Sequence, residues 1–258
     1  MYGTLSGHFM LGRIPGVISN ISNIPNNVVW YDAAVSNTAN FNVAPASGDD
    51  ISQWKDKSGT GHNANQSGTK TVKPNWFSNV QNGYGVVRYQ VDSSTESLNI
   101  NPASFMRNQG AFTLFVVAKA TSLSGNRSLV STDTTGYRIY FNGTNYQVAT
   151  AGGTGTSSVT GDTTKFHIFT VIFDGSGATN ADRLKFRYDG ADQTLNFGAT
   201  TVGTQTSGST TTYYLGVDDT GAAGYWNGDM GAVIIYTRAL TTNELIGVEE
   251  YLSNFWGI

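Results

Sequence analysis

The amino-acid sequence predicts an all-β protein, a sandwich of antiparallel sheets with one short helix at the C-terminal end. Three observations predict this fold. The 258 residues include 31 glycines, and charged residues make up only 13%, while Thr, Ser and Asn supply the polarity, a usage typical of strands and turns. Apolar segments of strand length recur with turn residues between them. A helical spacing of apolar residues occurs near the end of the chain alone.

The predicted strands are runs of β-branched and aromatic residues. Residues 112–118 are almost wholly apolar, which predicts a central strand. Residues 184–188 alternate apolar and basic side chains, so one face should lie in the core and the other in water. The Gly/Thr/Ser-rich stretch 150–164 is predicted to be a surface loop. The other predicted strands are 28–31, 85–89, 137–141, 146–148, 166–173, 212–217 and 230–236.

The helix is predicted from its ends as well as from its spacing. Thr241 and Glu244 form a capping-box pattern, in which the hydroxyl and the carboxylate satisfy free backbone amides. Gly257 stands where a helix usually ends. Between them, apolar residues recur at helical spacing: Leu245, Val248, Leu252 and Phe255.

Residues 1–27 differ from the rest and are predicted to be an extended N-terminal arm before a sandwich domain of residues 28–258. Ile18, Ile21 and Ile24 recur with a period of three, which fits an extended polyproline-like path. The arm is expected to dock on a partner or on copies of itself as a trimer. The alternative is a linker whose isoleucines pack on the sandwich. The apolar residues expected to make the partner contact are Phe9, Met10, Leu11, Ile14, Ile18, Ile21 and Ile24.

Composition excludes several classes of partner. The net charge is −3 and no run of Lys or Arg occurs, so nucleic acid is not an expected partner. No stretch approaches the roughly 18 consecutive apolar residues of a membrane helix. The chain has no cysteine, and therefore neither disulfides nor thiolate metal sites. The first residues lack the pattern of a signal peptide, so synthesis and assembly are expected in the cytoplasm.

Two segments resemble the concanavalin A-like, laminin-G-like jelly rolls. The closing segment runs from Tyr225-Trp226-Asn227-Gly228-Asp229 to Tyr236-Thr237-Arg238-Ala239-Leu240-Thr241 and a Glu-containing helix. The opening segment contains Trp30-Tyr31-Asp32-Ala33 and then Trp54-Lys55-Asp56-Lys57-Ser58-Gly59. The resemblance covers residues 28–258 and implies a two-sheet antiparallel jelly-roll sandwich. It says little about the ligand.

Catalysis is not expected. Glucanases of this superfamily carry Glu-x-Asp-x-x-Glu on one strand, because retaining glycosidases need two carboxylates about 5 Å apart. Here Glu96 has no acidic residue two or four positions later, and the other glutamates, Glu244, Glu249 and Glu250, lie in the predicted helix. The three histidines do not form a catalytic motif. The sequence therefore predicts a binding or structural protein.

Two kinds of binding site are considered. Asp218 and Asp219 are the best candidates for a calcium site, with solvated carboxylates as the alternative. A carbohydrate site would combine aromatic side chains with polar neighbours. Trp54 and Trp76 are alternatives for that site, although Trp54 and Trp226 also fit the core. The residues expected to bind sugar are Asp218, Tyr225, Trp226 and Asn227.

Two functions are compatible with these observations. The first is a virion protein of a bacteriophage, a capsid decoration or tail-fibre-associated protein held to other virion proteins by its arm. Its lectin-like domain is then expected to bind host cell-surface glycans. The low charge, the absence of cysteine and the apolar arm favour this hypothesis. The second is a soluble bacterial carbohydrate-binding module or adhesin.

Overall fold

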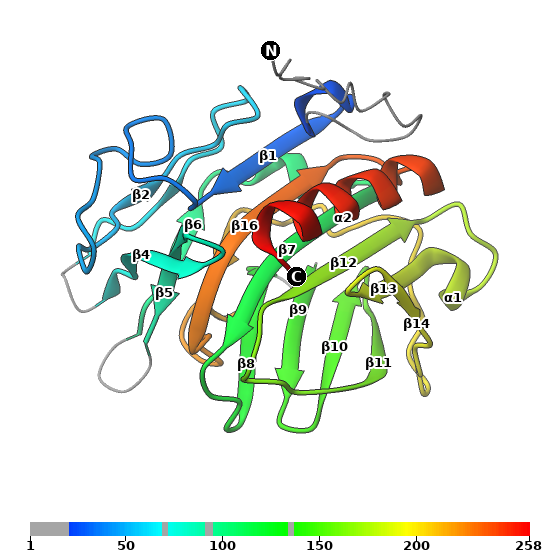
Figure 1. The fold of residues 1–258 in the computed structure, drawn as a ribbon. Coiled ribbons are helices and arrows are strands. Elements are labelled where there is room, and N and C mark those ends of the chain that lie inside the picture. Colours follow the sequence, from blue (N-terminus) through cyan, green and yellow to red (C-terminus); the bar gives the residue numbers. More distant parts are fainter. Residues whose placement is uncertain (1–20, 69–71, 91–94, 134–136) are drawn as a thin grey trace, which may run out of the picture.

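A computed structural model describes residues 21–68, 72–90, 95–133 and 137–258, and it confirms the antiparallel jelly-roll sandwich (Figure 1). The first sheet has β1 (Asn27–Asp32) beside β16 and otherwise the order β14 (Ala191–Gln193), β13 (Leu184–Tyr188), β12 (His167–Asp174), β7 (Ala111–Ala120), β16 (Gly228–Tyr236), β5 (Tyr84–Tyr89) and β4 (Asn75–Gln81). The second sheet has the order β11 (Gly153–Thr160), β10 (Asn145–Thr150), β9 (Tyr137–Asn142), β8 (Asn126–Thr132), β15 (Tyr213–Leu215), β6 (Leu98–Ile100), β3 (Ala64–Asn65) and β2 (Gln53–Trp54).

Large aromatic side chains fill the space between the sheets. Trp54 and Trp226 are fully buried there, and Trp54 stacks on Tyr31 with 5.3 Å between ring centroids. Trp76 is also buried, and its indole Nε1 donates to the Ala33 carbonyl at 2.8 Å. The sequence left two positions open for Trp54 and Trp226, in a sugar site or in the core. The structure places both in the core.

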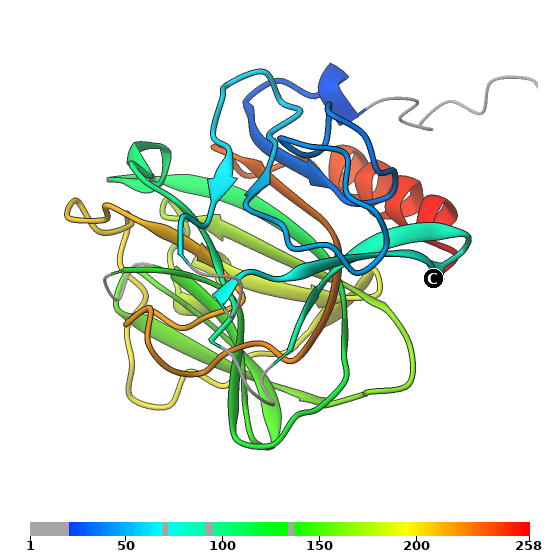
Figure 2. The ribbon, with the colours of Figure 1, turned by 90° about the vertical axis from the view of Figure 1, so that its left-hand side faces the viewer.

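One helix covers the outer face of the first sheet. Helix α2 (Thr242–Trp256) has the predicted capping box between Thr241 and Glu244, and Gly257 ends it in the left-handed conformation at φ 67°. Leu245, Val248 and Leu252 are buried beneath it. In Figure 2, α2 is the red helix, and it lies against the outer face of the first sheet. Strands β7, β12 and β16 are therefore buried on both faces, which explains their nearly continuous apolar sequences.

The described part of the chain also contains the short helices η1 (Ile21–Asn23), η3 (Ser104–Met106) and α1 (Asn180–Arg183). In η1, Ile21 is fully buried, and Ile24 just after it is 5% exposed. Both pack in the cluster between α2 and the first sheet, where Tyr236 donates its hydroxyl hydrogen to the Ile21 carbonyl at 3.3 Å. These two isoleucines thus pack on the sandwich of their own chain.

The prediction of a surface loop over 150–164 is wrong. Residues 153–160 form strand β11, which pairs with β10 at the edge of the second sheet. The glycines that suggested a loop are needed for close packing. A Cβ at Gly153 would lie 2.5 Å from Val202 Cγ2, and one at Gly155 would lie 2.9 Å from Leu195 Cδ1. Strand glycines can mark such close approaches rather than a break in the strand.

His167 at the start of β12 is buried among polar partners. Its Nδ1 lies 2.8 Å from Asp189 Oδ2 and its Nε2 lies 3.2 Å from Asp162 Oδ2. The ring stacks on Tyr188 with 4.5 Å between centroids. This histidine therefore fixes the chain at one end of the first sheet.

No helix in the described part of the chain is long and apolar enough to cross a membrane.

Substitution of Ile21 tests whether the first described residues are part of the folded domain. We expect Ile21→Ala to lower the free energy of unfolding by about 2–5 kcal/mol, because it removes a fully buried side chain and leaves a cavity. The control is Val43→Ala at a side chain that is 67% exposed, which should change stability by less than about 0.5 kcal/mol. Denaturant unfolding measures both. Equal stability of the two variants would show that Ile21 is not part of the folded domain.

The cap of α2 predicts a pH dependence. Arg238 donates to both carboxylate oxygens of Glu244 and lowers the pKa of Glu244 from 4.5 to about 2. The stability that Glu244 contributes is therefore present above pH 4.5 and is lost as the pH falls through about 2. We expect Glu244→Gln to cost about 1 kcal/mol at pH 7.

Unfolding measured at several pH values tests this expectation. The stability difference between the native chain and Glu244→Gln should shrink steadily towards pH 2. Glu250→Gln, at an exposed position of the same helix, is the matched control and should show no such dependence. A difference that stays constant from pH 7 to pH 2 would contradict the role of the Glu244 charge.

Candidate functional site

The two sheets differ in what covers their outer faces. Helix α2 covers the first sheet, as described above. In the second sheet, strands β9, β10 and β11 alternate between buried residues and partly exposed ones along much of their length. This alternation leaves one face of these strands open and polar. The outer face of the second sheet is therefore the candidate binding surface.

At the centre of this face, an arginine lies over an aromatic ring. Arg138 and Tyr140 are two residues apart on β9 and so point to the same side. The Arg138 guanidinium carbon lies 3.9 Å from the centroid of the Tyr140 ring, and Arg138 Nη1 lies 3.2 Å from Asp219 Oδ1. Arg138 and Asp219 each keep about a quarter of their side-chain surface exposed. The pair is held by its neighbours and still faces water.

Amide and hydroxyl side chains continue the face on both sides. Gln147 lies opposite Tyr140 on the neighbouring strand, and its Nε2 donates to Thr156 Oγ1 at 2.7 Å. On the other side, Tyr214 is paired with Ser131, which is itself paired with Arg138. Cross-strand pairing extends this row through Asn99 and Asn65 to Gln53. Hydrogen-bonding groups therefore follow the whole width of the sheet.

A small hollow of about 120 Å³ lies beside Arg138 and Asp219. Its other walls come from the turn between β10 and β11, including Gly152 and Thr154. Gly152 has a φ of 82°, a left-handed conformation that suits glycine at this tight turn. This conformation reverses the chain between β10 and β11 at one wall of the hollow.

The loop after β15 brings most of the predicted sugar-binding residues to the border of this face. Ser128 on β8 donates its backbone N–H to the Gly224 carbonyl at 2.7 Å, which holds the loop against the sheet. Tyr225 and Asn227 are half-buried in it. Trp226 is fully buried and presents no indole face to solvent. Of the predicted set, Trp226 is fully buried, while Asp218, Tyr225 and Asn227 are half-buried, and their contact with a sugar stays a prediction.

The candidate calcium ligands Asp218 and Asp219 have protein partners. Asp218 Oδ1 accepts hydrogen bonds from the hydroxyl and backbone N–H of Thr220 and from the Ala223 N–H. Asp219 is paired with Arg138. Over the residues that the structure describes, no three His, Asp or Glu side chains gather as a metal site would require. Calcium binding therefore stays a prediction from the sequence.

The predicted partner-binding arm is only partly described. Phe9, Met10, Leu11, Ile14 and Ile18 lie outside the described residues. Ile21 and Ile24 are the buried pair that packs beneath α2. These two side chains are not free to contact another protein in this conformation.

Sequence reasoning missed the centre of the candidate site. Arg138, Tyr140 and Gln147 stand within predicted strands but were not selected as binding residues. The signal was present, since Arg138 and Gln147 are the polar members of alternating strands. Alternation indicates that a residue faces outward. It does not indicate which outward faces a helix will cover, and this decides which residues can bind a ligand.

The sequence of the chain matches a known protein family. Residues 92–246, more than half of the chain, match the family model of the concanavalin A-like lectin/glucanases superfamily. No curated protein matches the chain significantly.

Solved structures with a similar fold share little sequence with this chain. A sialidase from Trypanosoma rangeli, in complex with the inhibitor DANA, has a TM-score of 0.55 at 14% identity, over 86% of this chain and 32% of its own. The binding domain of botulinum neurotoxin DC, in complex with rat synaptotagmin II, has a TM-score of 0.55 at 10% identity, over 90% and 52%. Domain 4 of an extracellular arabinanase from Geobacillus stearothermophilus, in complex with arabinotriose, has a TM-score of 0.51 at 12% identity, over 87% and 98%.

These likenesses concern the fold. The chain spans about a third of the sialidase and about half of the neurotoxin domain. It corresponds to nearly the whole of the arabinanase domain.

Proposed function

We propose that this chain, which belongs to the concanavalin A-like lectin/glucanases superfamily, is a non-catalytic domain that binds glycans on the outer face of its second sheet. The observation that carries the proposal is the contrast between the two sheets. The first is covered by α2, while the second exposes a row of aromatic, amide and charged side chains across paired strands.

The chemistry of this face suits a sugar. The half-buried Tyr214 ring offers apolar surface to the C–H face of a pyranose or furanose, whereas Tyr140 is 9% exposed and lies beneath Arg138. Neighbouring amides and hydroxyls meet the sugar hydroxyl groups. Arg138 and Asp219 neutralise each other, so the pair offers donors and acceptors without a net charge. One structure of similar fold, the arabinanase domain, was solved with arabinotriose, which supports a glycan as the ligand class.

The positions of the carboxylates support a non-catalytic function. A glycosidase needs an acid and a base or nucleophile near the same bond. Glu249 is bonded to Arg187, Glu244 to Arg238, and Glu96 accepts a hydrogen bond from the Gln90 backbone at 2.7 Å. Near the proposed sugar face, Asp218 and Asp219 are both held by protein donors. Each of these described carboxylates thus already has a donor from the protein, which supports the non-catalytic function that we propose.

The proposal includes a place for the domain, on a bacteriophage particle as a capsid decoration or tail-fibre-associated protein, with residues 1–27 as its attachment. The low charge, the lack of cysteine and the apolar N-terminal residues support it. The alternative is a soluble bacterial carbohydrate-binding module. Detection of the full chain in purified particles by mass spectrometry distinguishes the two, since a soluble module would be found only outside them.

A glycan array probed with the full chain tests the binding function. The array should hold neutral and acidic sugars, pentoses as well as hexoses. For a glycan that binds, we expect Arg138→Ala and Gln147→Ala each to raise the dissociation constant roughly tenfold, which is a loss of about 1.4 kcal/mol of binding free energy. Both residues lie on the sheet face that should contact the sugar, and neither is needed for the core.

Lys185→Ala is the control. Lys185 is exposed on β13 of the first sheet, away from the proposed face, so its removal should leave binding unchanged. The proposal fails if no glycan is retained. It also fails if a glycan binds equally well to Arg138→Ala, Gln147→Ala and the native chain, because the ligand would then lie elsewhere.

A further inference from the structure

The hollow beside Arg138 and Asp219 has a floor formed by one short side chain. Ala149 on β10 is paired with Arg138 on β9 and with Thr154 on β11, so these three residues form a row across three strands. All three are partly exposed and line the hollow. Because the methyl group of Ala149 is shorter than the side chains on either side of it, the hollow lies over this residue.

The lining residues lie on three sides of Ala149. The β9 side holds the ion pair described above, and the β11 side holds Thr154. The turn at Gly152 lies at the end where β10 passes into β11. In the other direction along β10, the next outward residue is Gln147, which is not part of the lining. The hollow is therefore open along the strand towards Gln147.

Contacts with residues 200–203 hold the turn in place. Gly203 donates its backbone N–H to the Ala151 carbonyl at 3.0 Å. Thr200 Oγ1 accepts from the Thr154 N–H at 3.1 Å and donates to the Thr154 carbonyl at 3.0 Å. This wall of the hollow is thus positioned before a ligand arrives, which lowers the entropic cost of binding.

Three polar side chains at the hollow keep hydrogen-bonding groups that no described residue uses. Arg138 donates through Nη1 to Asp219 Oδ1, which leaves its Nε and Nη2 as donors for a ligand. Asp219 Oδ2 and Thr154 Oγ1 likewise have no partner in the described part of the chain. A guanidinium, a carboxylate and a hydroxyl can together bind both the hydrogens and the oxygens of neighbouring sugar hydroxyl groups.

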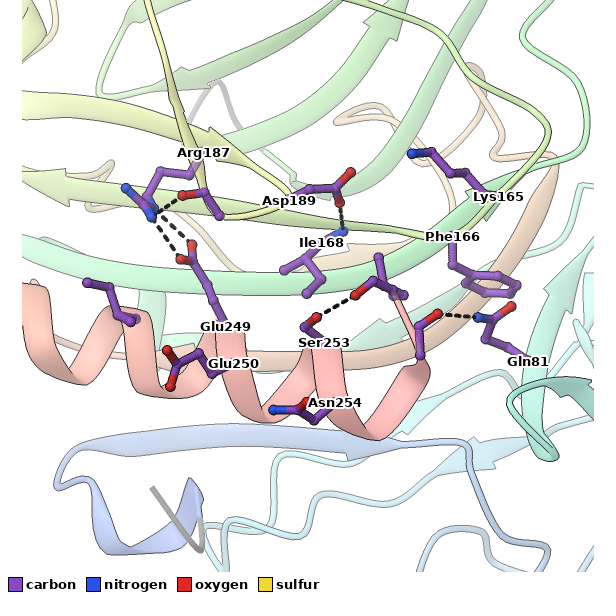
Figure 3. Close-up of a pocket in the computed structure, with 14 residues that line it drawn as sticks. Gln81, Lys165, Phe166, Ile168, Arg187, Asp189, Glu249, Glu250, Ser253 and Asn254 are labelled. Atoms are coloured by element: carbon purple, nitrogen blue, oxygen red, sulfur yellow. Dashed lines mark hydrogen bonds and ion pairs between the residues drawn. The ribbon is translucent and has the colours of Figure 1, made fainter. Parts of the chain in front are cut away.

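A larger groove of about 870 Å³, between α2 and strands β12 and β13, differs in this respect (Figure 3). There, Arg187 donates to both oxygens of Glu249 at 2.9 Å. Gln81 donates to the Trp256 carbonyl at 2.7 Å. Several polar groups of the groove are thus bonded within the protein, whereas those of the hollow remain available to a ligand.

The size of the hollow limits its occupant to one sugar ring. Its volume is about 120 Å³. A cavity of about 150 Å³ takes up one benzene ring, so the hollow has room for one five- or six-membered ring and not for two. A sugar unit inside a chain continues at two points, whereas the lining leaves one open side along the sheet. This geometry favours the end of a chain.

We propose that the hollow binds the terminal unit of a neutral glycan, with its ring over Ala149 and its hydroxyl groups bonded to the ion pair and to Thr154. The next unit then lies over Gln147, about 7 Å further along β10. Arg138 and Asp219 neutralise each other, so an uncharged sugar fits without disturbing their contact. The inference rests on the proposed function and adds that the protein recognises chain ends.

An NMR titration of the isotope-labelled full chain with single neutral sugars tests the proposal. The probes are glucose, galactose, mannose, xylose, arabinose, fucose and N-acetylglucosamine, each added into the millimolar range. We expect at least one of them to shift the amide signals of Ala149, Gly152 and Thr154 to saturation, because a single sugar is enough to fill the hollow.

Substitutions in the hollow make the test specific. Ala149→Leu fills the hollow from its floor and should raise the dissociation constant of the bound sugar roughly tenfold or more. Thr154→Val keeps the shape of the side chain and removes its hydroxyl, so it should raise this constant roughly fivefold. The matched control is Ala191→Leu, at an exposed position on β14 of the first sheet, which should bind like the native chain.

Three results would overturn the proposal. If a glycan retained on the array binds through Arg138 but no single sugar shifts the amides of the hollow, the face binds the interior of chains and the proposed function stands. If Ala149→Leu binds that glycan as well as the native chain does, the hollow is not occupied. If a single sugar binds in the hollow but no glycan on the array is retained, the site takes free monosaccharides. When neither a glycan nor a single sugar binds, the proposed function fails as well.

Discussion

The packing of α2 against the first sheet determines which surface of this protein is available to a ligand. The chain enters the helix through a corner that the sheet itself holds. Thr113 on β7 donates its hydroxyl hydrogen to the Arg238 carbonyl. Its hydroxyl oxygen also accepts a hydrogen bond from the Leu240 N–H at 3.0 Å. At the other end, Trp256 lies against Gly231, where a Cβ would come within 2.8 Å of the indole ring. Both ends of the helix are thus fixed to β7 and β16.

This arrangement separates two kinds of surface. The cluster beneath α2 takes up the apolar side chains on the outer face of the central strands, while those on the inner face lie in the core between the sheets. No described helix covers β9, β10 and β11 of the second sheet, and their partly exposed side chains are mostly polar. A sandwich with one covered and one open sheet therefore has a natural binding face.

Much of the fold could be predicted from the sequence. Residues 112–118 and 230–236 are apolar over most of their length because both their faces are buried, and the capping box at Thr241 and Glu244 places the start of the helix. Strand β11 could not be predicted, because its glycines serve close contacts with Val202 and Leu195, residues far away in the sequence. Very short strands such as β2 and β3 depend on pairing with distant segments in the same way.

The candidate site was harder to predict from the sequence than the fold. The loop that carries Asp218 and Tyr225 could be selected because its composition is unusual, and the structure places it at the border of the open face. The burial of Trp226 could not be decided, because a tryptophan in a Gly-rich turn has the same local sequence whether it faces the core or the solvent. Arg138 became a candidate only when cross-strand pairing placed it in one row with Ser131 and Tyr214 and placed its strand neighbour Tyr140 opposite Gln147.

The central claim is that the second sheet, and not the covered first sheet, holds the ligand. The most direct measurement is an NMR titration of the isotope-labelled full chain with the glycan that binds it best. The account predicts that amide shifts concentrate in β9, β10, β15 and residues 217–227, while those of α2, β12 and β13 stay unchanged. Shifts concentrated along α2 and β13, with β9 and β10 unaffected, would contradict it.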